Sequence, residues 1–104
     1  MNNLNLEITK DQTQDGVRFF LKGQIDSDNV SSLEKELDAA LNEGKKNILL
    51  NMSRVDYLSS VGIRVIVKAY KAAKETGGNV SIELPSENVK KILVMTSLEE
   101  ILVL

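Results

Sequence analysis

The segment "NILLNMSRVDYLSSVGIRV", residues 47–65, contains the change of hydrophobic pattern that decides the fold. Its first six residues, "NILLNM", are short, apolar and uninterrupted, which is typical of a strand covered on both faces. From about Ser60 to Thr76, apolar residues recur at helical spacing and two glycines follow as a stop signal. The segment therefore predicts a buried strand, a loop "VDYLSSVG", and a helix that begins at the serines.

Two strands and a helix are expected before this segment. Residues 4–8 and 17–21 alternate between apolar and polar side chains around a turn at Gly16, which predicts an antiparallel hairpin. Apolar residues from Val30 to Leu41 then share one helical face. The start of this helix has three candidate N-caps, namely Ser27, Asp28 and, in a capping box with Glu34, Ser31.

A strand and a helix are expected after it. "NVSIEL", residues 79–84, reads as a strand, and Pro85 and Ser86 open a third helix. The C-terminal "ILVL" reads as a last short strand or a turn docked on the core. The order ββαβαβα(β) predicts a single α/β domain over residues 1–104, with a mixed, mostly parallel sheet of 4–5 strands and about three helices.

Composition excludes several classes of function. The 104 residues include no cysteine and no histidine, which excludes disulfides, the usual zinc sites and Ser-His-Asp chemistry. A net charge of −2 argues against nucleic-acid binding. No apolar run is long enough to span a membrane, and the N-terminus lacks a secretory pattern. We expect a soluble, cytoplasmic protein without membrane insertion, metal or cofactor.

The serines at the strand-to-helix junction allow several interpretations. Ser60 would be a good N-cap for the second helix. A helix N-terminus also stabilises a phosphate, so the same position suits a phosphorylated serine. A nucleophilic role is disfavoured because there is no G-x-S-x-G motif and no histidine base. A Walker-type phosphate loop is absent as well.

Charged residues give weaker signals. Asp26 and Asp28 suit turn and cap positions. Asp26, Asn51 and Asp56 carry oxygen ligands for a metal ion, but their spacing matches no known motif. The second helix carries basic residues at i, i+4 and i+7, flanked by Ile63 and Val67, which indicates either a solvated face or a docking surface for an acidic partner. These basic residues are Arg64, Lys68 and Lys71.

The chain resembles the STAS domain family of bacterial anti-sigma factor antagonists over nearly its whole length. The family motif D-S-[SA]-G-[LI]-G corresponds to "SSVGIR", residues 59–64, and "KGQID", residues 22–26, resembles the family signature G-[ED]-[LI]-D. "AKETGGNVSIELPSENVKKIL", residues 73–93, also resembles the family. Further matches precede the serines at Asn51, Ser53, Val55, Tyr57 and Leu58. Three positions depart from the motif: Ser59 replaces its aspartate, Val61 its small residue, and Arg64 its second glycine.

The resemblance implies an anti-sigma factor antagonist rather than an enzyme. It implies a partner switch in which the chain binds an anti-sigma factor serine kinase, is released by phosphorylation of Ser60, and is reset by a phosphatase. The residues implied around the phosphoacceptor are Asp26, Asn51, Ser59 and Gly62. The implied partner-binding residues are Asp26, Ser27, Tyr57, Ser60, Val61, Ile63, Arg64 and Val67.

Two alternatives remain open. In one, the chain is a non-phosphorylated STAS module that serves as a scaffold in a signalling or transporter complex, and the serines only cap the helix. In the other, the chain is a small enzyme or nucleotide binder, against which the missing histidine, cysteine and phosphate loop count.

Overall fold

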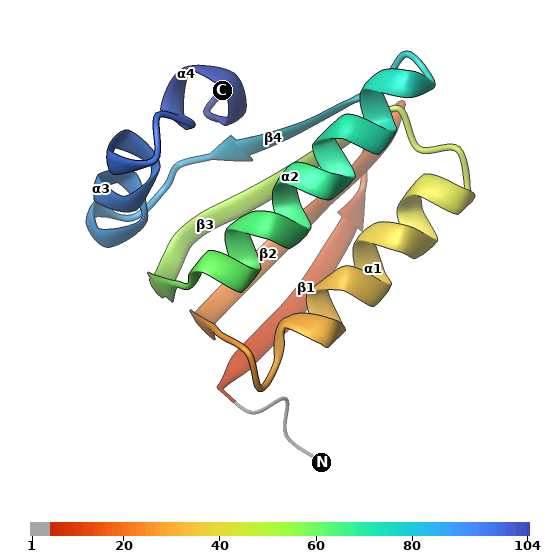
Figure 1. Cartoon of the computed structure of the whole chain (residues 1–104). Coiled ribbons are helices and arrows are strands. Elements are labelled where there is room, and N and C mark those ends of the chain that lie inside the picture. The colour runs from red at the N-terminus through yellow and green to blue at the C-terminus, as the bar shows by residue number, and fades with distance from the viewer. Residues whose placement is uncertain (1–4) are drawn as a thin grey trace.

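A computed structural model describes residues 5–104. Four strands form one sheet in the order β1-β2-β3-β4 (Figure 1). The first two strands pair antiparallel, and the other two pairs are parallel. The strands are β1 (Leu6–Gln12), β2 (Gly16–Ile25), β3 (Asn47–Leu58) and β4 (Asn79–Glu83).

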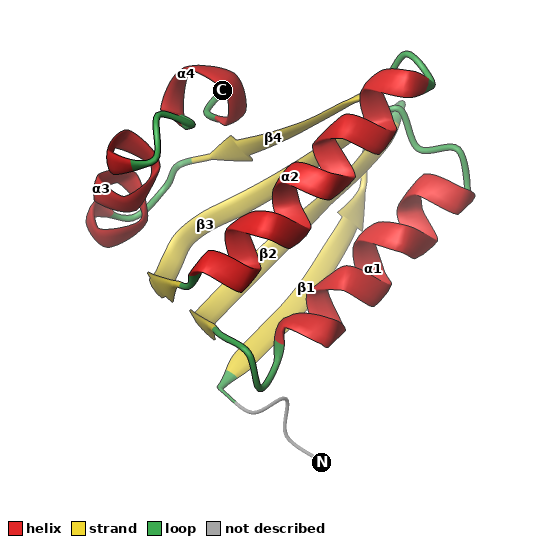
Figure 2. Cartoon of the chain, in the orientation of Figure 1, coloured by secondary structure: helices red, strands yellow, loops and turns green. Residues whose placement is uncertain are grey.

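Four helices complete the domain, as Figure 2 shows. The two long helices, α1 and α2, lie side by side over one face of the sheet, and each provides the crossover between parallel strands. The two short helices lie on the β4 side of the sheet. No helix within residues 5–104 is both long and apolar enough to cross a membrane. The helices are α1 (Val30–Asn42), α2 (Ser60–Glu75), α3 (Glu87–Met95) and α4 (Glu99–Leu102).

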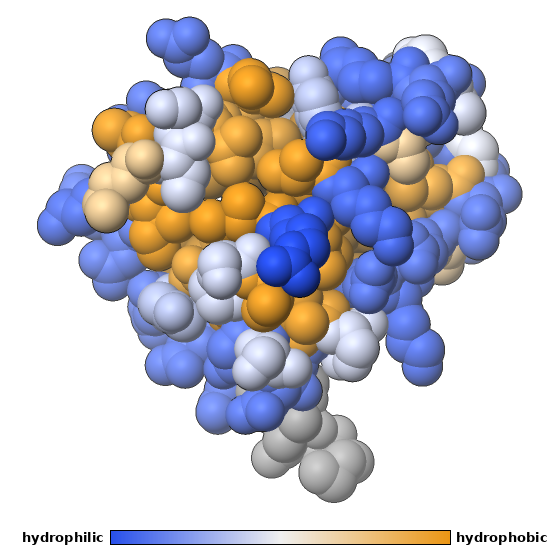
Figure 3. Space-filling model, in the orientation of Figure 1, coloured by the Kyte–Doolittle hydropathy of each residue, from blue (hydrophilic) through white to orange (hydrophobic). Residues whose placement is uncertain are grey.

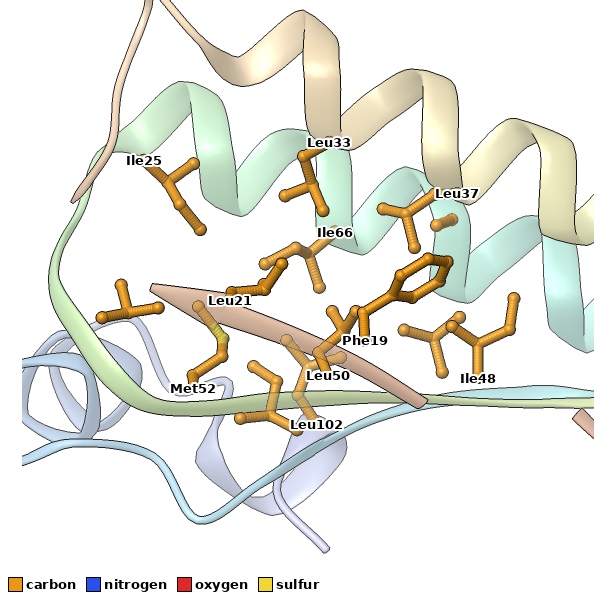
Figure 4. Packing of buried hydrophobic residues seen from close by; sticks show 14 of the residues in the cluster. Phe19, Leu21, Ile25, Leu33, Leu37, Ile48, Leu50, Met52, Ile66 and Leu102 are labelled. Atoms are coloured by element: carbon orange, nitrogen blue, oxygen red, sulfur yellow. The ribbon is translucent and has the colours of Figure 1, made fainter. Parts of the chain in front are cut away.

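The core lies between the sheet and the long helices. Figure 4 shows Phe19 and Leu21 of β2 and Leu50 of β3 facing Leu37 of α1 and Ile66 of α2. All five side chains are buried, so truncating one of the leucines to alanine would cost about 2–5 kcal/mol. This packing fixes α2 against the strands whose ends carry the candidate site.

The predicted element order is confirmed, but β3 differs from the prediction in two ways. It continues through Leu58, so half of the segment predicted as a loop is strand. Its buried side chains, which include Ile48 and Leu50, point to the helical face, whereas Leu49 and Asn51 are only half-buried on the other face. The expectation of a strand covered on both faces was therefore wrong.

The helices also differ from the prediction in their details. α1 begins at Val30 with Asn29 before it, so the helix already includes the proposed capping box at Ser31 and Glu34. In α2, the buried row is Gly62, Ile66, Ala69 and Ala73, and Val61, Val65 and Ala72 are half-buried beside it. Of the C-terminal "ILVL", Ile101 and Leu102 end α4, and Val103 makes one parallel bridge with Ile82.

Candidate functional site

The site is built where β2 and β3 end side by side. Ile25 and Leu58, the last residues of these strands, are register partners, and the Ser59 N–H donates to the Ile25 carbonyl at 3.0 Å. The segment from Asp26 to Asn29 therefore leaves the sheet next to the first turn of α2. Ligands of parallel sheets commonly bind at such carboxyl ends.

Ser59, rather than Ser60, caps α2. The Ser59 backbone is extended, and its Oγ accepts from the Gly62 N–H at 3.2 Å. Its carbonyl accepts the first helical hydrogen bond, from the Ile63 N–H, at 3.0 Å. The expectation that Ser60 supplies the cap was therefore wrong by one residue, and the two hydroxyls have different roles.

Ser60 is the first residue of α2, and its side chain is exposed. Within residues 5–104, its hydroxyl makes no hydrogen bond that would hold it in place. The first turn of α2 carries no acidic side chain, so the partial positive charge of the helix start is not offset there. The Ser60 hydroxyl is thus accessible and lies where a phosphate dianion would be stabilised.

Gly62 holds this turn close to the strand ends. A Cβ atom at this buried position would lie 2.7 Å from Ile25 Cγ2 and 2.8 Å from Leu58 Cδ1. Both distances are below normal van der Waals contact, so a larger residue would push the first turn of α2 away from the sheet. Gly62 therefore acts by positioning Ser60 rather than through contact with it.

The turn after β2 is held by Asn29, whose role the sequence analysis missed. The Asn29 side chain is 1% exposed; its Oδ1 accepts from the Asp26 N–H at 3.0 Å, and its Nδ2 donates to the Gln24 carbonyl at 2.8 Å. Asp26 Oδ1 in turn accepts from the Asp28 N–H at 3.0 Å. These bonds fix the backbone that presents Asp26 and the exposed Ser27 beside α2.

Asn51 is not brought to the serines. It lies seven residues before the end of β3, which corresponds to about 20 Å of strand. Its Nδ2 donates to Glu83 at 3.2 Å, and its Oδ1 accepts from the Ser53 hydroxyl at 2.8 Å. Glu83 also accepts from Arg18 at 2.7 Å and raises the pKa of that guanidinium by hydrogen bonding and charge. In this structure Asn51 therefore lies away from the serines, and its place in the phosphosite stays a prediction.

The three oxygen-bearing residues considered as metal ligands, Asp26, Asn51 and Asp56, do not form one site. Asp56 lies near the end of β3, five residues beyond Asn51 along the strand. No group of three acidic side chains within residues 5–104 is arranged to hold a metal ion.

The remaining predicted partner-binding residues share the surface around the start of α2. Ser60, Arg64 and Val67 follow one another at spacings of four and three, which places them along one ridge, with Ser60 and Arg64 exposed and Val67 half-buried. Val61 and Ile63 are half-buried on either side of Ser60. Tyr57, at the end of β3, is 49% exposed.

The basic stripe of α2 divides into two parts. Lys68 donates to Glu34 of α1 at 3.0 Å, and this hydrogen bond is the main cause of its raised pKa. Arg64 and Lys71 are exposed and make no ion pair within the described part of the chain. Lys68 therefore links the two long helices, whereas Arg64 and Lys71 are available to a partner.

Comparison with known proteins agrees with this geometry. The STAS domain profile matches residues 7–104. BtrV of Bordetella bronchiseptica, named as a candidate anti-sigma factor antagonist, is 31% identical to this chain over 75 residues. The match covers 72% of this chain and 65% of BtrV, so the chain spans just under two thirds of the length of that relative. The anti-sigma-B factor antagonist of Bacillus subtilis is 24% identical over 99 residues, covering 95% of this chain and 90% of that protein.

Solved structures show the same fold. The unphosphorylated form of the anti-sigma factor antagonist SpoIIAA superposes with a TM-score of 0.82 at 18% identity, over 93% of this chain and 86% of that chain. The phosphorylated form of SpoIIAA from Bacillus gives a TM-score of 0.75 at 18% identity, over 93% and 89% of the two chains. With a profile match over almost the whole length and this fold, the chain belongs to the STAS domain family.

Proposed function

We propose that this chain is a cytoplasmic anti-sigma factor antagonist that works by binding and is controlled by phosphorylation of Ser60. In its unphosphorylated form, it binds an anti-sigma factor that is also a serine kinase, and the sigma factor is released. The observation that carries the proposal is the division of roles at the start of α2, where Ser59 caps the helix and leaves the exposed Ser60 hydroxyl unbonded within residues 5–104. Relatives named as anti-sigma factor antagonists support it.

The replacement of the motif aspartate by Ser59 is compatible with this role. Aspartate and serine are both good N-caps, so the hydrogen bond to the Gly62 N–H is kept. What the chain loses is a negative charge next to the phosphoacceptor. We infer that the kinase that modifies this chain recognises Ser60 without an acidic neighbour at position 59.

Phosphorylation would act on the partner interface and leave the fold intact. The phosphate adds about −1.5 to −2 charges at a surface that includes the apolar Val61 and Ile63. An interface that closes over this surface would have to desolvate the dianion, which is costly without a matching cation. Because Ser59 and Gly62 hold the first turn, the charge would release the partner with little internal rearrangement.

The binding surface combines the ridge of α2 with the neighbouring turn. Ser60, Arg64 and Val67 form the ridge, and Asp26 and Ser27 lie beside its start. Arg64 replaces a glycine of the family motif and adds a long cationic side chain one turn beyond Ser60. We therefore propose that Arg64 contributes to the choice of partner.

The proposal is tested by the affinity of four variants for an anti-sigma factor kinase, measured by calorimetry without ATP. Ser60→Ala should bind like the native chain, whereas Ser60→Asp should bind more weakly because it places a charge in the interface. Ser31→Ala, an exposed serine of α1 outside the proposed surface, is the matched control for loss of a hydroxyl and should bind like the native chain. Arg64→Gly restores the family residue and should change the affinity, because it removes the cation of the ridge. Equal affinities of Ser60→Asp and Ser60→Ala would overturn the switch and favour a scaffold module that is not phosphorylated.

A further inference from the structure

Exposed apolar side chains gather on the two short helices, away from the ridge of α2. Val94 and Met95 at the end of α3 are 53% and 82% exposed, and Ile101 of α4 is 51% exposed. We call these three residues the α3–α4 patch. Figure 3 shows apolar side chains gathered over this side of the molecule, where α3 and α4 lie in Figure 1.

The packing of the domain does not account for this patch. The inward faces of the two helices are already occupied by Val89 and Leu93 of α3 and Leu102 of α4, which are at most 1% exposed. A surface helix normally has polar residues on the face opposite its buried stripe. Grouped apolar side chains on an outward face commonly mark an interaction surface.

Charges of opposite sign border the patch. Lys90 and Lys91 are exposed on α3, and Lys91 precedes Val94 and Met95 by three and four residues, which places it on their side of the helix. Glu99 and Glu100 line a surface hollow together with Val94. None of these four charges forms an ion pair within residues 5–104.

We propose that the α3–α4 patch is an isologous interface between two copies of this chain. A two-fold axis through the patch pairs each surface with itself in the reverse direction. The lysines of one copy then face Glu99 and Glu100 of the other, and the arrangement repeats with the copies exchanged. An apolar centre with a self-complementary charged rim is what such an interface requires.

The expected dimer is weak and depends on concentration. A four-residue helix and the last turn of a nine-residue helix offer less surface than the roughly 800 Å² per partner of a standard interface. We therefore expect a dissociation constant above about 1 μM. The burial of Met95 and Val94 supplies most of the association, and the charge pairs select the two-fold orientation.

Sedimentation equilibrium of the full chain at concentrations from about 5 to 500 μM, a range set by the expected affinity, tests the proposal. The average mass should rise from that of one chain towards twice that value. Met95→Lys should keep the chain monomeric at every concentration, with an unchanged melting temperature because the side chain is almost fully exposed. Phe20→Thr removes an exposed apolar side chain from the sheet and is the matched control, which should still dimerise.

Charge reversal tests the two-fold arrangement. Lys90→Glu with Lys91→Glu, or Glu99→Lys with Glu100→Lys, should each weaken self-association at least about tenfold. An equimolar mixture of the two double variants should form a heterodimer, because one then presents only acids and the other only bases. A monomer over the whole range, a dimer that survives Met95→Lys, or variants that fail to pair when mixed would each overturn the proposal.

Discussion

Alanine substitutions of the two serines at the start of α2 should differ in their effect on the stability of the domain. Ser59→Ala removes the hydroxyl that accepts from the Gly62 N–H at 3.2 Å, and the N–H of this buried glycine is left without its partner in the first turn. Loss of a serine N-cap costs about 0.5–2 kcal/mol, most often near 1 kcal/mol. Ser60 is already inside the helix and exposed, so Ser60→Ala should change the stability by less than about 0.5 kcal/mol.

Urea titration and thermal unfolding of both variants measure this difference. For a domain of this size, a loss of 1 kcal/mol lowers the melting temperature by about 4–8 °C. Ser59→Asp is the matched control, because aspartate caps as well as serine and its charge is favourable at a helix start. A loss of stability in Ser60→Ala equal to that in Ser59→Ala would refute the assignment of the cap to Ser59.

Three further results are expected from the described contacts. Gly62→Ala should destabilise the domain by about 1 kcal/mol, because overpacking against the buried strand ends outweighs the gain in helix propensity, and urea unfolding measures the balance. Asn29→Ala should cost about 1–3 kcal/mol and sharply raise amide exchange at Asp26, whose N–H loses a buried acceptor; unchanged exchange would contradict the role given to Asn29. The raised pKa of Lys68 means that the folded state holds this proton more tightly, so the stability from its pair with Glu34 should decrease as the pH rises above about 10.5, and Lys68→Gln should flatten this part of a stability–pH profile.

The overall fold could be predicted from the sequence because hydrophobic periodicity and glycine stops mark most elements clearly. The end of β3 could not. Arg54, Asp56 and Tyr57 are exposed, and together they resemble a polar loop. Val55 and Leu58, which are buried, continue the strand, but register shifts in its pairing with β2 break the simple alternation that identifies a strand.

The candidate site was predicted in part. The family motif identified Ser60, but either serine suits a cap by composition, and only the extended backbone of Ser59 decides between them. Asn51 lies away from the serines because a motif that is compact in sequence extends over about 3.3 Å per residue when it lies in a strand. Asn29 was missed because its role depends on burial, and a single asparagine between a turn and a helix gives no signal of that.

The central claim is that Ser60 is the phosphoacceptor, and phosphosite mapping tests it most directly. The native chain, Ser60→Ala and Ser59→Ala are incubated with ATP and an anti-sigma factor serine kinase that binds the chain, and mass spectrometry locates the phosphate. We predict one phosphoryl group, on Ser60, in the native chain and in Ser59→Ala, and none in Ser60→Ala. A native chain that stays unmodified while the same kinase phosphorylates another antagonist, or that carries its phosphate on Ser59, would contradict the claim.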